Sequence, residues 1–77
     1  MQFQTLNKKL QIELLKVHFE MLPVDWDNCF FHDEKYFTMY FNCFLRKNTL
    51  FALIKIADCL HFDFCPISDR MIDIKTK

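Results

Sequence analysis

The sequence contains no glycine among its 77 residues. Phosphate-cradling loops, dinucleotide-binding fingerprints and nucleophile elbows rely on glycine, because their backbone approaches a ligand closely or adopts a positive φ. The usual forms of these sites are therefore excluded. Tight turns must instead be made by asparagine, aspartate and the two prolines, Pro23 and Pro66.

Neither sign of charge is in excess, since ten Lys and Arg balance ten Asp and Glu. No strong overall field directs the chain toward nucleic acid, an anionic membrane or an acidic substrate. Long hydrophobic runs are lacking too, because no stretch approaches the ~20 apolar residues that span a bilayer. Residues 1–15 lack the pattern of an export signal. We therefore expect a soluble cytoplasmic protein whose four cysteines are reduced.

Apolar bulk is abundant, since 52% of the residues are hydrophobic and ten are phenylalanine. A chain of this length is expected to form a single domain, residues 1–77, and to bury only about 60% of the surface that its unfolded form exposes. Bulky aromatic side chains offset this small size, because each one removes a large apolar area from water.

Residues 5–22 are predicted to form an amphipathic helix that ends before Pro23. The spacing of apolar residues gives this helix two adjoining apolar faces. The first face consists of Leu6, Leu10, Leu14, Val17 and Met21. The second face consists of Ile12, Leu15, Phe19 and Leu22.

Three further helices and an extended tail are expected. Residues 24–31 are predicted as a short helix, and residues 34–45 as a third helix capped by Asp33, although their aromatic content also allows a strand. Residues 49–60 are predicted as a fourth helix with caps at Asn48 and Thr49. Residues 61–75 alternate in polarity, which predicts a hairpin or a pair of extended arms. Such strands would pair with another chain or pack on the helices.

The string TLFALIKIADCL at residues 49–60 resembles the fourth helix of XRE/Cro-type repressors and of the related HigA-like antitoxins. In that family a segment T-L-x-x-L-x-K-I-A-x-x-L packs beneath the DNA-reading pair of helices. Residues 22–24 lie where the family begins its second helix. The resemblance implies a mainly α, four-helix Cro/repressor-like helix-turn-helix domain with a C-terminal β-hairpin or extended arm.

The same resemblance implies a function and a set of residues that perform it. Residues 34–45 would be the recognition helix of a small dimeric DNA-binding transcriptional regulator, either an antitoxin or a phage repressor-like protein. Its partners would be operator DNA and a toxin or host protein. The base edges and phosphates would be contacted by Lys35, Thr38, Asn42, Arg46 and Lys47. The homodimer would form through the tail, at Phe62, Phe64, Ile72 and Ile74.

A rival interpretation comes from a different class of protein. Zero net charge, the acidic residues Asp33 and Glu34 at the start of the reading helix, and the surplus of aromatic residues favour it. In this interpretation the chain is a helix-turn-helix-like protein-interaction module without DNA binding, such as a phage-encoded inhibitor of a host defence or transcription complex.

Neither a cofactor nor enzymatic activity is expected. No nucleophile, base and stabilising group can be assembled from the spacing of the residues. Five residues could ligate zinc, but their spacings are weak and cysteine is more often simply buried. These residues are Cys29, His32, Cys59, His61 and Cys65.

Overall fold

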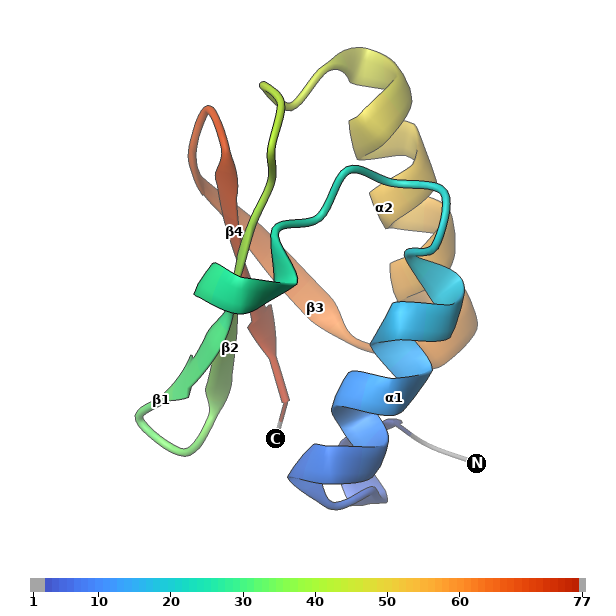
Figure 1. Ribbon diagram of the computed structural model, residues 1–77. Coiled ribbons are helices and arrows are strands. Elements are labelled where there is room, and N and C mark those ends of the chain that lie inside the picture. Colours follow the sequence, from blue (N-terminus) through green and yellow to red (C-terminus); the bar gives the residue numbers. More distant parts are fainter. Residues whose placement is uncertain (1–2, 77) are drawn as a thin grey trace.

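The computed structural model describes residues 3–76, which form two α-helices and a four-stranded sheet (Figure 1). In chain order the elements are η1 (Phe3–Thr5), α1 (Lys8–His18), η2 (Trp26–Asn28), β1 (Phe30–His32), β2 (Tyr36–Tyr40), α2 (Lys47–Leu60), β3 (Asp63–Ser68) and β4 (Met71–Lys75). The η elements are short 3₁₀ turns.

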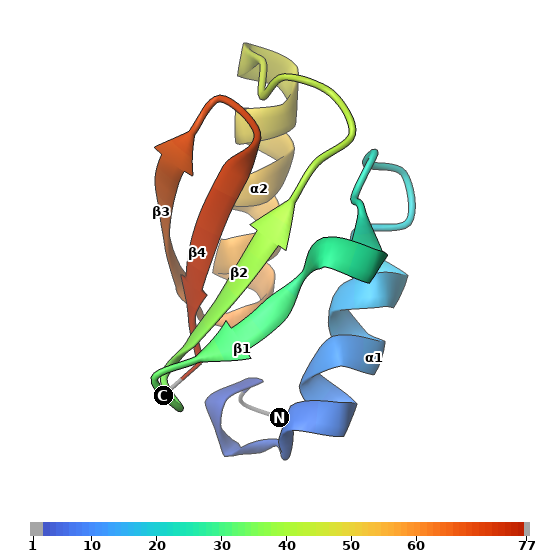
Figure 2. The same cartoon turned by 60° about the vertical axis from the view of Figure 1, so that its left-hand side comes forward.

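The sheet is antiparallel throughout, with the strand order β1-β2-β4-β3. The two central strands are β2 and β4, and a register shift between Pro66 and Ser68 interrupts the pairing of the edge strand β3. Both helices lie on the same side of the sheet (Figures 1 and 2). The described part of the chain therefore has two layers, and neither of its α-helices covers the opposite face of the sheet.

This α/β architecture corrects the predicted mainly α, four-helix fold. A helix does form within residues 5–22, α2 closely matches the helix predicted at 49–60, and the tail does form a hairpin. The helices predicted at 24–31 and 34–45 are wrong, because this part of the chain folds into η2 and the β1–β2 hairpin. Without those two helices there is no helix-turn-helix in residues 3–76.

The burial of β2 explains why the helical interpretation of 34–45 failed. Phe37 and Met39 are buried against the helices, whereas Tyr36 and Tyr40 alternate with them and are half-buried on the other face. A run in which nearly every residue is apolar matches both a helical and a strand period. Pairing with β4, more than 30 residues later in the chain, selected the strand.

The turn between β1 and β2 depends on backbone that glycine would normally supply. Asp33 and Glu34 have φ values of 53° and 58°. Left-handed backbone of this kind favours glycine, and aspartate tolerates it better than most other residues. Asp33 was predicted to cap a helix, but it begins this turn instead.

A cap defines the start of α1 and the end of α2. Asn7 accepts a hydrogen bond from the backbone N–H of Leu10 at 2.9 Å, which fixes the start of α1. α2 begins at Lys47, before the caps predicted at Asn48 and Thr49. It ends at Leu60 and is followed by the C-cap residue His61, whose φ is 61°, and the backbone N–H of Phe62 then donates to the carbonyl of Ala57.

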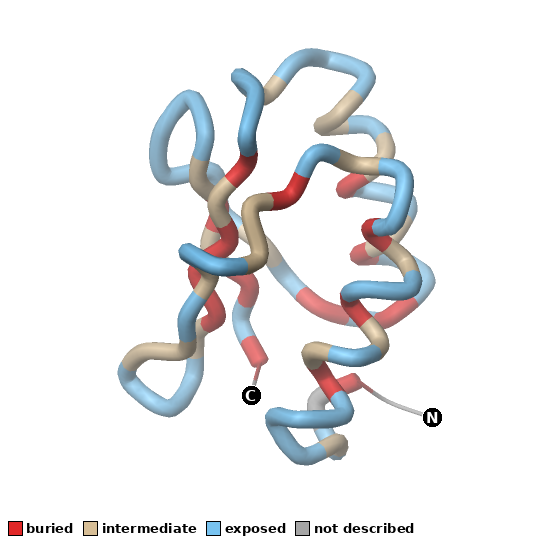
Figure 3. Tube along the Cα trace, viewed as in Figure 1, coloured by how far each residue is buried: buried red, intermediate tan, exposed pale blue. Residues whose placement is uncertain are grey.

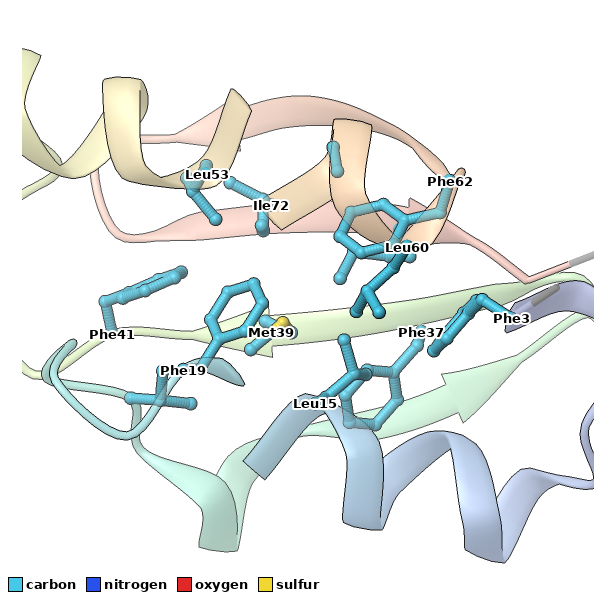
Figure 4. Packing of buried hydrophobic residues seen from close by; sticks show 13 residues of the cluster. Phe3, Leu15, Phe19, Phe37, Met39, Phe41, Leu53, Leu60, Phe62 and Ile72 are labelled. Atoms are coloured by element: carbon cyan, nitrogen blue, oxygen red, sulfur yellow. The ribbon is translucent and has the colours of Figure 1, made fainter. Parts of the chain in front are cut away.

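The core lies between the helices and the inner face of the sheet (Figures 3 and 4). Phe3 packs against Phe62 with ring centroids 5.4 Å apart, so the first described residues are held on the end of α2. Gln11 is the buried polar residue of α1, and its Nε2 donates to the carbonyls of Phe3 and Thr76. Residues from both ends of the described chain are therefore tied to one helix.

The predicted dimer interface lies largely inside this core. Phe62 is 5% exposed and Ile72 and Ile74 are fully buried, while Phe64 is half-buried and packs against the core. The tail was expected to pair with another chain or to pack on the helices, and in the structure β4 pairs with β2 and β3 of its own chain while Ile72 and Ile74 pack into the core. Phe62, Ile72 and Ile74 are therefore part of the monomer's own core, whereas Phe64 is partly accessible at the surface.

Candidate functional site

The residues predicted to contact DNA do not share a helix. Lys35 lies in the β1–β2 turn and Asn42 in the loop after β2, whereas Arg46 precedes α2 and Lys47 begins it. Thr38 is only 3% exposed within β2. Residues 34–45 do not form the recognition helix that was to carry these residues. Binding to operator DNA therefore stays a prediction, and no reading helix in residues 3–76 supports it.

The five candidate zinc ligands are dispersed as well. Among residues 3–76 no three His, Cys, Asp or Glu side chains lie close enough together to hold one metal ion. All four cysteines are free, and Cys29 is the one that is half-buried. Burial raises the pKa of the Cys29 thiol, and Asp25 adds to this effect, although the backbone N–H of Tyr40 donates to Sγ and opposes it. A thiol held protonated in this way is a poor nucleophile.

The outer face of the sheet is one surface that the core leaves uncovered. A row of rings crosses its β1–β2 half, in the order Tyr40, Phe30, His32 and Tyr36. The successive ring centroids are 6.4, 5.7 and 5.6 Å apart. Beside this row lies a hollow of about 410 Å³, which is lined by Tyr36, Asp63, Phe64, Cys65, Ile67, Asp73 and Lys75.

A hydrogen-bonded group fixes the centre of this outer face. Thr38 Oγ1 donates to Asp73 Oδ1 at 2.6 Å, and His32 Nε2 lies 3.5 Å from the same oxygen. Nδ1 of His32 lies 3.4 Å from a carboxylate oxygen of Asp33. The polar groups of this face therefore bind one another across β1, β2 and β4.

Charge on the outer face does not suit nucleic acid. Aromatic rings on a sheet can stack bases, but such surfaces also need cations for the phosphates. Here the register places the carboxylates of Asp63 and Asp73 on the same face as a single ammonium group, that of Lys75. A phosphate backbone would meet more negative than positive charge on this face.

The second uncovered surface is an apolar groove between α1 and the end of α2, which we call the helix groove. Its volume is about 540 Å³, and it is lined by Leu6, Leu10, Glu13, Leu14, Val17 and Leu60. Leu10 is 49% exposed and Val17 is 68% exposed. Three of these residues, Leu10, Leu14 and Val17, follow one another along α1 at the spacing of one helical face.

The sequence analysis identified these side chains but not their role. Both apolar faces of residues 5–22 were visible in the spacing. Leu15 and Phe19 of the second face are buried in the core, whereas Leu10 and Val17 of the first face remain exposed. Nothing in the sequence alone marked which of the two faces the sheet would cover.

Together, the fold and these surfaces define a small two-layer α/β domain with a bare sheet face and an open groove between its helices. We find no protein-family model, no curated protein and no solved structure that matches the chain. Within the described residues, neither helix has the length and apolar character needed to cross a membrane.

Proposed function

We propose that this protein is a protein-binding module that takes up an amphipathic helix of a partner protein in the helix groove. This function is the protein-interaction alternative that was drawn from the sequence, without the helix-turn-helix. A toxin or a host protein, the partners expected from the sequence, would each have to present such a helix.

The observation that carries the proposal is the second apolar face of α1. A helix of a small soluble domain normally has one apolar stripe, which faces the core. One apolar row of α1 faces the core and includes the buried Leu15. A second row, made by Leu10, Leu14 and Val17, lines the groove. Contiguous exposed apolar side chains of this kind mark interaction sites.

The shape of the groove favours a helix over an extended peptide. One wall is the exposed apolar row of α1, and the other is formed by Leu60 at the end of α2. An amphipathic helix lays its apolar side chains along such a surface with anchors at i, i+3, i+4 and i+7. α1 has 11 residues, which at a rise of about 1.5 Å per residue gives a length of about 16 Å. Three turns of a partner helix would match it.

The strength of binding can be estimated from the exposed apolar surface. Burial of a whole leucine or valine side chain contributes about 1.5–3 kcal/mol. Leu10 is about half exposed and Val17 about two thirds exposed, so covering both would contribute about 2–3 kcal/mol on this side of the interface. The partner's own apolar side chains would add a similar amount.

A titration of the full-length protein with a designed helix tests the proposal. The probe is a fluorescently labelled 18-residue peptide with leucines at i, i+3, i+4 and i+7, and its binding is followed by anisotropy. Binding should weaken at least about tenfold in Val17→Asp, which puts a charge into the apolar groove. The matched control is Phe51→Asp, since Phe51 is as exposed on α2 but does not line the groove.

Two results would contradict the proposal. One is a failure of the peptide to bind wild-type protein at high micromolar concentrations. The other is an equal loss of binding in Phe51→Asp, which would mean that the peptide adheres to any exposed apolar side chain. Sedimentation of the same samples gives a further check, because a dimer that Val17→Asp dissociates would assign the groove to a second copy of the chain.

A further inference from the structure

We infer that the helix taken up by the helix groove is basic beside its apolar face, and that Glu13 selects it. This inference rests on the proposed function, since it specifies the partner of the same groove. Glu13 would act as a specificity-determining residue, and the leucines and valine would supply the affinity.

Among the described residues 3–76, Glu13 is the one charged residue that lines the groove. It follows Leu10 by three residues and precedes Val17 by four, so it is the neighbour of both on the surface of α1. Its side chain is exposed, and it takes part in no ion pair within residues 3–76. The carboxylate is therefore free to pair with a group on whatever covers the groove.

Two lysines of α1 are held over aromatic rings that do not line the groove. Lys8 Nζ lies 5.2 Å from the ring centre of Phe31, and Lys16 Nζ lies 5.9 Å from that of Trp26. Cations over aromatic rings at such distances are attracted to the ring faces. These contacts engage two of the three ammonium groups of α1. The third, that of Lys9, lies on an exposed side chain four residues before Glu13 and does not line the groove.

The charge also distinguishes a partner helix from a second copy of this chain. In a two-fold dimer built on this groove, each α1 would bring its own Glu13 to the shared apolar surface. Like charges brought close together at an interface are unfavourable and act against that pairing. A partner helix with Lys or Arg next to its apolar residues would instead meet an opposite charge.

Two designed peptides test the inference. Both have the same leucine face and length, but one has lysine and the other glutamate at the positions that flank the leucines. Wild-type protein at low ionic strength should bind the lysine peptide about threefold to tenfold more tightly, and added salt should shrink this ratio. Glu13→Gln should bring the ratio toward one, and Glu13→Lys should invert it.

The control is Asp58→Lys, which changes the net charge by the same amount as Glu13→Lys at an exposed position of α2 that does not line the groove. It should leave the preference for the lysine peptide in place. Equal binding of both peptides, or a preference that Glu13→Lys does not alter, would refute the selection by Glu13 and leave the proposed function standing. If neither peptide binds, the proposed function itself fails.

Discussion

The two uncovered surfaces of this domain differ in how their side chains are engaged. On the outer face of the sheet, Thr38, His32 and Asp73 bind one another, and the aromatic rings lie in a row. In the helix groove, Leu10 and Val17 have no such arrangement and are about half exposed or more. We therefore propose that the sheet face serves the stability of the fold, whereas the groove serves binding.

The largest expected effect separates the two apolar faces of α1. Phe19→Ala removes a fully buried ring from the core and should lower the free energy of unfolding by about 3–5 kcal/mol. Val17→Ala, in the groove, should change it by less than about 0.5 kcal/mol. Urea denaturation of both variants measures the contrast, and a comparable loss in Val17→Ala would show that the groove supports the fold.

The next effect concerns the sheet face. Thr38→Val keeps the shape of the side chain but removes the 2.6 Å hydrogen bond to Asp73. It should lower the free energy of unfolding by about 1–2 kcal/mol, because the carboxylate loses a donor in a poorly solvated position. Affinity for the leucine peptide should not change. A weaker affinity with unchanged stability would reverse the roles of the two surfaces.

A smaller and opposite effect is expected at the end of α2, next to the groove residue Leu60. His61 has left-handed backbone with φ of 61°, and glycine adopts this conformation without the steric cost, which is about 1 kcal/mol. His61→Gly should therefore raise the free energy of unfolding by about 0.5–1 kcal/mol. Thermal melting checks this, and a lower melting temperature would mean that the imidazole contributes more than the backbone costs.

The smallest expected effect is on the chemical reactivity of Cys29, which tests the burial of its thiol without a substitution. Cys29 lies beneath Tyr40 of the sheet and its thiol pKa is raised by burial, whereas Cys43, Cys59 and Cys65 are exposed. At pH 8 the reactive thiolate of Cys29 should be the scarcest, so iodoacetamide should modify Cys29 last. Mass spectrometry of timed digests measures the order of modification, and early labelling of Cys29 would show that this part of the sheet opens readily.

The elements that were predicted correctly have a clear local pattern. Residues 49–60 combine a helical period with polar residues on the other side, and the strands of the tail alternate. Residues 24–45 were predicted wrongly because aromatic and apolar residues there are too dense for either period to stand out. The turn at Asp33 was missed because its usual sequence signal is a glycine, and this chain has none.

The candidate site was predicted only in part. Spacing alone assigned Leu10, Leu14 and Val17 to one face of a helix, and the groove is built on that face. The resemblance at residues 49–60 directed attention to Lys35 and Arg46, which belong to unrelated parts of the fold. A short similarity in one amphipathic helix reports on how that helix packs, because the same apolar spacing suits many folds.

By itself, the sequence determined that the first helix would have two apolar faces, although contact with the core requires only one. The spacing of the residues along the helix fixes these faces. It also determined that turns would need left-handed residues other than glycine. The tertiary structure decided which face of α1 stays exposed, that residues 36–40 form a strand, and that Thr38 and Asp73 meet across it. These outcomes depend on contacts between residues distant in sequence, and local periodicity carries no information about them.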